Sequence, residues 1–220
     1  MSLGFLPSVP QLITYVIILL TAFPVHEFAH AWTANYFGDN TPRANGRLTL
    51  NPLAHLDPIG TILMIVAGFG WAKPVPINPY ILERRSPAAP MLVSLAGPMS
   101  NLLMAILGAA FFRVGLVSTS NIQIISGQIL PSLALFLYLF ISVNLWLMLF
   151  NLLPLFPLDG EKVLAYFLPP GAARSLESIR PYGPMILMVI LFVLPLVGID
   201  VIGKVIAPVF SLLTHLLIGA

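Results

Sequence analysis

The sequence has no cysteine and few charged residues, and each absence narrows what the protein can be. Without cysteine there are no disulfides and no thiolate ligands, so a metal site must be built from imidazole and carboxylate groups. Only 8% of the 220 residues are charged, whereas 58% are hydrophobic, and the mean hydropathy is +0.96. So few polar groups cannot cover a soluble globule, and the apolar runs have the length of a bilayer. The composition therefore predicts an all-α, polytopic membrane protein, a helical transmembrane bundle.

Other absences exclude further classes of protein. The net charge of +2 comes from short loops rather than from a basic face, so nothing supports a nucleic-acid partner. Residues 1–11 lack the Lys or Arg of a signal peptide, so we expect the first apolar segment to remain in the mature protein. No stretch is long or polar enough for an added soluble domain. We therefore expect a single domain over residues 1–220, surrounded by the lipid bilayer.

The run His26-Glu27-Phe28-Ala29-His30 lies inside the first apolar stretch. Two histidines four residues apart share one face of a helix, so both imidazoles can bind a single Zn²⁺, one per chain. Glu27 can then reach a water on that metal and act as the catalytic acid/base. The alternative is a hydrogen-bonded histidine pair inside a bundle. Burying acidic or basic groups at bilayer depth costs about 2.5 to 3.5 kcal/mol each, and a metal accounts for that cost better than packing does.

Three long apolar stretches predict helices at 8–36, 88–117 and 129–153, and two further apolar stretches lie at 185–198 and 205–219. Proline at position 24 is tolerated in the first helix, because other helices or water can cover the carbonyl that it frees. The later stretches are separated only by a short segment that contains Asp200 and Lys204. Their composition is that of membrane-embedded helices.

The segments between the helices give weaker signals. Segment 59–71 is apolar but shorter than the roughly twenty residues of a spanning helix, so it predicts a re-entrant or interfacial segment. Residues 47–50 alternate between polar and apolar, which predicts a short β-strand or hairpin. Residues 73–79 contain three prolines and are expected to be non-helical, with a solvated bend at 83–85. The polar stretch 159–181 is expected to be a loop.

The positive charges are unevenly divided among the loops. Loops 38–58, 72–89 and 159–181 carry eight Lys or Arg residues, whereas 113–128 carries one. Positively charged loops favour the cytoplasmic side, so the first three are expected there. This arrangement requires segment 59–71 to return to the side from which it starts. Both the histidine pair and the end of the 129–153 helix then lie toward the cytoplasm.

A catalytic zinc site uses three protein ligands and leaves a position open for water, so one more ligand is needed. Asp159 is the best candidate, because it lies at the same depth as the histidines and because prolines and Gly160 flank it. A turn aspartate that caps the following helix would look the same in the sequence. Asp57 and His55 form the next candidate pair. For His55, a role in a turn or in supporting a ligand is simpler than ligation.

These motifs together resemble the site-2 protease family of intramembrane zinc metalloproteases. The resemblance rests on residues 26–30, on Asn151-Leu152-Leu153-Pro154 and on Pro157-Leu158-Asp159-Gly160, and residues 50–60 are similar to the compact prokaryotic branch. It covers nearly the whole chain. It implies regulated cleavage of a membrane-anchored substrate within or near its transmembrane helix, the substrate being a single-span protein or a remnant signal peptide. It also implies His26, His30 and Asp159 as zinc ligands with Glu27 as acid/base.

The same resemblance assigns roles to further residues. Asn151 matches the family asparagine that holds the substrate or the oxyanion, and Gly97 and Asn101 match a helix-packing Gly-x-x-x-Asn element. A multi-pass protein of a prokaryotic cell membrane, with its active site toward the cytoplasm, is the implied location. The chain departs from the family in having no PDZ or CBS domain. It also has Glu161 where a small residue commonly follows the Asp-Gly pair.

A non-enzymatic class also fits a buried metal site. Membrane transporters place His and Asp in broken helices, and a scaffold that holds zinc without cleaving would use the same ligands. Glu27 favours the protease, because a protein that only binds metal needs no uncoordinated carboxylate at that spacing. No internal inverted repeat is visible in the sequence.

Overall fold

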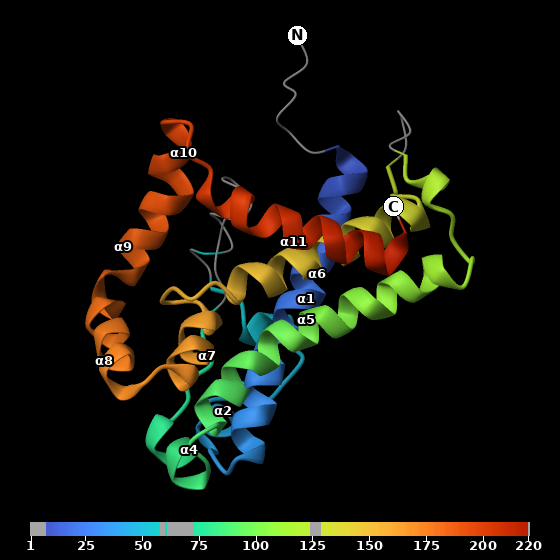
Figure 1. Ribbon diagram of the computed structural model, residues 1–220. Helices are drawn as coiled ribbons and strands as arrows, with labels where there is room; N and C mark the ends of the chain where they lie inside the picture. Colours follow the sequence, from blue (N-terminus) through green and yellow to red (C-terminus); the bar gives the residue numbers. More distant parts are fainter. Residues whose placement is uncertain (1–7, 58–59, 61–72, 124–128, 220) are drawn as a thin grey trace.

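A computed structural model describes residues 8–57, 60, 73–123 and 129–219 (Figure 1). In these ranges the chain forms helices and no β-strand. Five helical stretches are long and apolar enough to cross a membrane: α1 (Val9–Tyr36), α5 (Ala89–Arg113), α6 (Leu133–Asn151), the stretch Pro170–Leu196, and α11 (Val201–Ile218). The structure therefore agrees with the predicted multi-pass helical protein.

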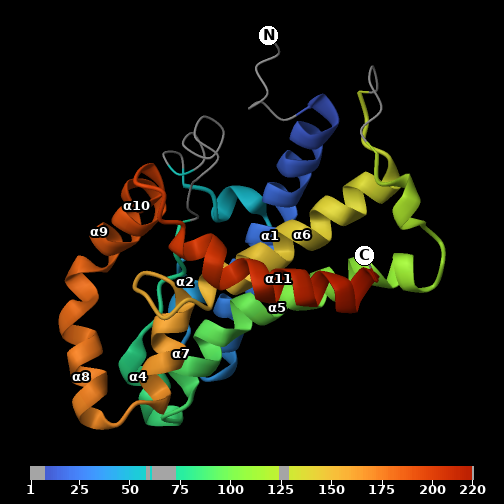
Figure 2. The same ribbon diagram turned by 45° about the horizontal axis from the view of Figure 1, so that its top comes forward.

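Helices α1, α5 and α6 form the packed centre, and α11 crosses over α5 and α6 (Figures 1 and 2). Small residues allow the close approach of α5 and α6, as is common between helices in membranes. A Cβ on Gly108 of α5 would lie 3.1 Å from Ile141 of α6. Arg113 ties the far ends of α5 and α11 together by donating hydrogen bonds to the carbonyls of Leu217, at 2.8 Å, and Leu216.

The three long helices follow the sequence prediction closely. Helix α1 begins one residue after the expected start, where the Ser8 backbone N–H donates to Gln11 Oε1 at 2.8 Å, and it continues through Pro24. Helices α5 and α6 are shorter at their ends than the predicted 88–117 and 129–153. The predicted residues beyond these ends are mostly apolar but lie in turns, bends or irregular backbone, since apolar composition alone does not define where a helix ends.

The predicted strand at 47–50 is wrong. Arg47 in this stretch is buried, and its guanidinium donates hydrogen bonds to the backbone carbonyls of Ala54 and, at 3.5 Å, Lys73. The local backbone is therefore an irregular loop wrapped around a buried charge, which an alternating pattern does not reveal. It leads into the short 3-10 helix η1 (Pro52–Ala54), whose first N–H groups are capped by Asn51.

Most of the predicted re-entrant segment, 59–71, lies outside the described residues. The residues that flank it are close together, because the backbone N–H of Lys73 donates to the carbonyl of His55 at 2.8 Å. Helix α4 (Pro79–Arg85) and the turn between α7 (Asp159–Phe167) and α8 (Pro170–Ile179) lie toward one end of the molecule, and the start of α1 and the end of α5 lie toward the other (Figure 1).

The predicted bend at 83–85 is instead part of α4 (Pro79–Arg85). Proline is accepted at the first position of a helix, and the side chain of Asn78 caps the start by accepting from the N–H of Tyr80 at 3.1 Å. Asp39 is fully buried and accepts hydrogen bonds from Asn78, at 2.6 Å, and from Thr41 at the start of α2 (Thr41–Ala44). This carboxylate therefore joins the end of α1 to α4.

The predicted loop 159–181 is also wrong, because it is mostly helical. It contains α7 (Asp159–Phe167) and α8 (Pro170–Ile179), and the helical path goes on through η3 (Arg180–Tyr182), α9 (Gly183–Met188), the π-helical η4 (Val189–Val193) and α10 (Leu194–Leu196). The short 3-10 helix η2 (Thr119–Asn121) follows α5. Polar residues in 170–179 lie on exposed helix surface, and their number in the sequence suggested a loop.

Candidate metal centre

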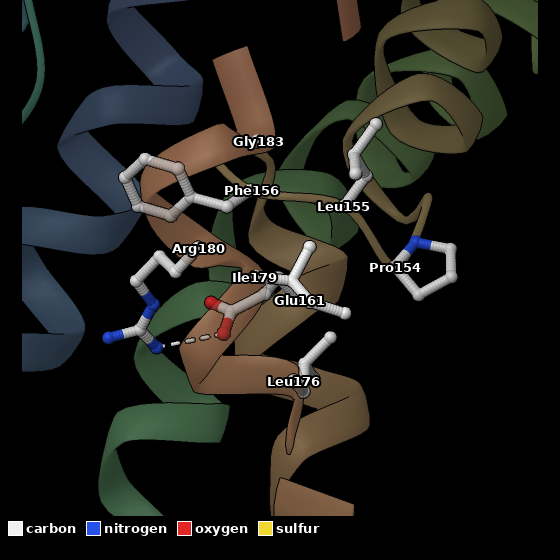
Figure 3. A pocket seen from close by; sticks show the side chains of 8 residues that line it. All are labelled: Pro154, Leu155, Phe156, Glu161, Leu176, Ile179, Arg180 and Gly183. Atoms are coloured by element: carbon white, nitrogen blue, oxygen red, sulfur yellow. Dashed lines mark hydrogen bonds and ion pairs between the residues drawn. The ribbon is translucent and has the colours of Figure 1, made fainter. Parts of the chain in front are cut away.

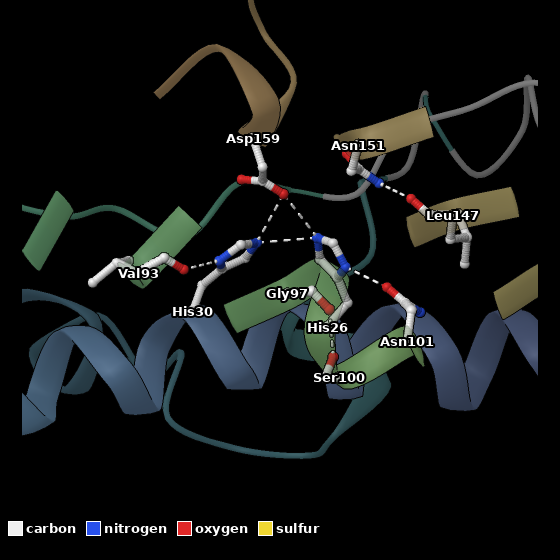
Figure 4. A network of polar contacts seen from close by, with 9 residues as sticks. All are labelled: His26, His30, Val93, Gly97, Ser100, Asn101, Leu147, Asn151 and Asp159. Atoms are coloured by element: carbon white, nitrogen blue, oxygen red, sulfur yellow. Dashed lines mark hydrogen bonds and ion pairs between the residues drawn. The ribbon is translucent and has the colours of Figure 1, made fainter. Parts of the chain in front are cut away.

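Three side chains from distant parts of the chain meet between α1 and the start of α7 (Figure 4). His26 and His30 lie one turn apart on α1, and their Nε2 atoms are 3.0 Å from each other. Asp159, the first residue of α7, places its Oδ2 atom 3.3 Å from each Nε2. Each residue thus offers one ligand atom, and the three atoms lie within 4.8 Å of one another. The structure therefore brings together the three residues that the sequence proposes as ligands.

The histidine hydrogen bonds leave both Nε2 atoms available for a metal. His26 Nδ1 lies 2.6 Å from the side-chain oxygen of Asn101, and His30 Nδ1 lies 2.7 Å from the carbonyl oxygen of Val93. Both oxygens accept, so each Nδ1 carries the hydrogen and each Nε2 presents its lone pair. Two imidazoles and one carboxylate converging in this way match a catalytic zinc site, which keeps a fourth position open.

The carboxyl group of Asp159 is in the form that a metal requires. Burial alone would raise the pKa of Asp159, but the positive charge of a protonated His30 and hydrogen bonds from the His26 and His30 imidazoles hold it well below its usual range. A ligand carboxylate must be ionised to bind a metal. A divalent cation in place of those histidine protons would keep a positive charge beside the ionised carboxylate, with the two imidazoles as neutral donors.

Gly97 of α5 leaves room for the two imidazoles (Figure 4). A Cβ at this position would lie 2.6 Å from His26 Nε2 and closer still to His30 Nε2. No side chain fits there without moving the ligands. The Gly-x-x-x-Asn element thus does more than pack helices, because Gly97 borders the metal centre and Asn101 contacts one of its histidines.

Gly160 allows α7 to start close to the end of α6. A Cβ on Gly160 would collide with the backbone of Leu152 and Leu153. This close approach places the preceding residue, Asp159, beside α1. Asp159 begins the helix and does not cap it, since the cap position is Leu158. The alternative of a capping aspartate is therefore not what the structure shows.

The other sequence candidates lie at different places. Asn151 ends α6 near the cluster, and its Nδ2 donates to the carbonyl of Leu147 at 2.9 Å (Figure 4).

His55 is fully buried after η1, where its Nε2 is 2.7 Å from the carbonyl of Thr49, so it holds a turn. Asp57 accepts from the N–H of Gly60 at 2.9 Å. The structure does not bring the His55 and Asp57 pair into the metal cluster. Glu27 is half-buried and follows His26 on α1.

Two contacts at this centre were not predicted from the sequence: the carbonyl of Val93 and the side chain of Asn144. Asn144 of α6 is fully buried and accepts a hydrogen bond from Asn101 at 2.9 Å. An amide in the middle of a highly apolar helix is a signal that could have identified it. A backbone acceptor such as Val93 leaves no such signal.

A second polar contact lies on the other side of α7 (Figure 3). Glu161 is buried, and its Oε1 accepts a hydrogen bond from Arg180 Nη2 at 2.8 Å. The guanidinium also lies over the ring of Phe156, 5.8 Å from its centre. A small cavity adjoins this pair, lined mainly by apolar side chains of 154–156 and of α8. The residue that departs from the family pattern is therefore the buried half of an ion pair whose arginine is partly exposed.

Comparison with known proteins finds relatives that extend over most of the chain. It is 45% identical to "Putative zinc metalloprotease YwhC" of Bacillus subtilis over 181 residues, which cover 82% of this chain and 80% of the relative. It is 32% identical to "Putative zinc metalloprotease Rip2" of Mycolicibacterium smegmatis over 183 residues, or 78% of this chain and 64% of that protein. For Rip2 of Mycobacterium tuberculosis the values are 30% over 182 residues, 80% and 65%. The chain thus spans slightly less than two thirds of the Rip2 proteins. No family model and no solved structure matches the chain.

Proposed function

The chain belongs to the site-2 protease-like family of zinc metalloproteases, and from this membership we propose that it hydrolyses peptide bonds within or near the transmembrane helices of membrane-anchored substrates. The observation that carries the proposal is the convergence of His26, His30 and Asp159 among helices long and apolar enough to span a bilayer. A zinc ion held by these three residues would supply Lewis acidity, which lowers the pKa of a water and polarises a peptide carbonyl.

Glu27 is the proposed acid/base. It follows a ligand directly, so it lies about 100° round the helix from His26 rather than beside it. Its carboxylate takes the proton of the attacking water and delivers it to the leaving amine when the peptide bond breaks. The acid/base and the two histidine ligands thus lie within about one turn of α1.

Asn151 is proposed to stabilise the oxyanion that develops on the substrate carbonyl. One of its two N–H groups is used by the carbonyl of Leu147, which leaves the second for the substrate. A donor of this kind is worth about 2.7 to 4 kcal/mol where it has been measured.

The substrate class follows from the surroundings of the site. In a transmembrane helix every carbonyl is hydrogen-bonded internally, so the substrate must unwind locally before attack. We propose a single-span protein or a remnant signal peptide, cleaved in regulated intramembrane proteolysis. The resemblance to the compact prokaryotic branch favours a prokaryotic cell membrane, and the positively charged loops favour an active site toward the cytoplasm. Cysteines introduced at Arg43, Arg84 and Arg174 should then label from the cytoplasmic side, and one at Asn121 from the other. Opposite labelling of Arg43 and Arg84 would contradict this orientation.

The competing proposal is a zinc scaffold or a metal transporter, which uses the same ligands but needs no base. Glu27→Gln separates the two, because glutamine keeps the shape and the hydrogen bonding and removes the base. The purified variant should bind zinc like the parent and lose cleavage of single-span substrates by several orders of magnitude, a loss typical of removing a reacting group. Glu83→Gln, at an exposed position of α4, is the matched control. Parent-like cleavage by Glu27→Gln, or loss of zinc from that variant alone, would favour the scaffold or transporter.

A further inference from the structure

Two buried amides meet between α5 and α6, next to the metal centre. Asn101 and Asn144 are both 0% exposed, and they lie in two helices that are long and apolar enough to cross a membrane. Burying an amide without a partner costs about 1–3 kcal/mol in proteins. Here every amide nitrogen and oxygen of the pair has a partner, so the two side chains form one complete chain of hydrogen bonds from the carbonyl of Phe140 to His26.

The direction of this chain is set at its far end. The backbone carbonyl of Phe140 only accepts, so the Nδ2 of Asn144 donates to it, at 2.8 Å. The Oδ1 of Asn144 must then accept, and Asn101 Nδ2 donates to it at 2.9 Å. This turns the oxygen of Asn101 toward His26, whose Nδ1 lies 2.6 Å away and donates. The lone pair of His26 is thereby left on Nε2, facing His30 and Asp159.

The two histidines are oriented by different means. His30 donates directly to the carbonyl of Val93, which is backbone and cannot turn over. His26 donates to a side-chain amide, and an amide can rotate by half a turn to present its NH₂ group instead. An NH₂ group facing Nδ1 would favour the other tautomer, with the hydrogen on Nε2 where the metal needs a lone pair. The histidine that depends on Asn101 therefore needs something to fix Asn101.

We propose that Asn144 is a positioning residue for the metal centre: it holds the amide of Asn101 in the orientation that keeps His26 Nε2 free for zinc. Asn144 touches neither the metal ligands nor the substrate site directly, and it acts through Asn101. The proposal rests on the zinc site of the proposed function, and it adds the residue that sets the tautomer of one ligand.

The test compares Asn144→Leu with Ser142→Ala, a control on the same helix whose hydroxyl is buried and has no hydrogen-bond partner among the described residues. Zinc affinity is measured by competition with a chelator. Outer hydrogen-bond partners of metal ligands typically contribute 10–100-fold to affinity, and we expect Asn144→Leu to weaken zinc binding about tenfold. The control should match the parent. Asn144→Asp keeps an acceptor for Asn101 and should bind zinc like the parent.

A readout independent of zinc comes from two-bond ¹H–¹⁵N spectra of the metal-stripped protein. The parent should show His26 protonated on Nδ1, and Asn144→Leu should move the hydrogen to Nε2 while His30 stays unchanged. If the leucine variant does not fold, Asn144→Ser takes its place with the same expected result, because serine leaves Asn101 without its acceptor.

The last control tests whether the substitutions at Asn101 and Asn144 affect zinc binding through the same route. If Asn144 acts through Asn101, the double variant Asn101→Leu/Asn144→Leu should bind zinc as Asn101→Leu alone does. Additive losses, or an unchanged His26 tautomer in Asn144→Leu, would overturn the inference. A parent protein that binds no zinc would instead refute the proposed function, and the tautomer spectra would still decide the role of Asn144.

Discussion

Helix α7 carries two acidic residues, two positions apart, whose surroundings differ. Asp159 faces His26 and His30, and the second nitrogen of each histidine has its own hydrogen-bond partner. Glu161 pairs with Arg180, but its Oε2 atom and the Nε atom of Arg180 are buried without hydrogen-bond partners among the described residues. In the first cluster, that of Asp159 and the histidines, both nitrogens of each imidazole therefore have a neighbour that orients the ring, as a ligand site requires. The second cluster, the Glu161–Arg180 pair, joins α7 to η3, and one polar atom of each side chain makes no hydrogen bond within the described residues.

The packing around the two clusters differs in the same way. The histidines sit on α1, against the well-buried centre formed with α5 and α6. Arg180 belongs to the stretch Pro170–Leu196, which has the smallest buried share of the spanning-capable helices. A site on the tightly packed helices is held in place, whereas sparsely packed elements open at lower cost. The histidines of the candidate metal centre thus lie on a tightly packed helix, and the ion pair joins α7 to the sparsely packed stretch Pro170–Leu196.

The largest effect should come from removing the carboxylate of the first cluster. Asp159→Ala deletes one of three ligands, so zinc affinity should fall by more than about 100-fold, beyond the usual effect of residues that only support ligands. Metal analysis of the purified variant after dialysis against a weak chelator measures the loss. Full zinc retention would show that Asp159 is not a ligand and that the two acidic residues of α7 are equivalent.

The next effect tests how tightly the metal centre is enclosed. Gly97→Ala places a methyl group where the two Nε2 atoms converge, so it should displace the imidazoles and weaken zinc binding, though by less than Asp159→Ala does, with about 1–3 kcal/mol of destabilisation from overpacking. Gly171→Ala in α8 is the matched control, because a Cβ there meets nothing within 4 Å. Zinc titration and thermal unfolding of both variants give the comparison. Equal zinc binding in the two would mean that α5 does not confine the site.

The smallest effect is expected at the second cluster. Glu161→Gln removes the charge opposite Arg180, whose side chain is 37% exposed and can turn to water. We expect about 1 kcal/mol of destabilisation, near the value for exposed ion pairs, and no change in zinc affinity. Chemical unfolding and zinc competition are the measurements. A loss of zinc comparable to that of Asp159→Ala would show that the ion pair positions the ligand and that the two clusters act as one unit.

The same contrast explains what the sequence could predict. The proposed ligand pair, His26 and His30, is local, four residues apart on one helix, so the sequence is enough to place the two side chains together. Asp159 is distant in sequence, but few acidic residues lie at the right depth, and the choice was therefore narrow. The long helices are equally visible, because bilayer-length apolar runs have few alternatives.

What the sequence did not reveal depends on contacts between segments. The buried Arg47, bonded to backbone carbonyls, was taken for part of a strand because its partners lie in another loop. Helices α7 and α8 were taken for a loop because their polar side chains face outward or pair across the fold, as Glu161 does with Arg180. The role of Asn144 depends on its hydrogen bond with Asn101, which forms only because α5 and α6 pack together.

The zinc ligands themselves are the central claim, and X-ray absorption at the zinc edge of the purified, zinc-loaded protein tests it most directly. Two imidazole nitrogens at about 2.0–2.1 Å, with only oxygen completing the coordination, is the expected spectrum. The imidazole signal should fall by half in His26→Ala. A spectrum without imidazole scattering, or one unchanged in that variant, would contradict the assignment of His26, His30 and Asp159 as the metal centre.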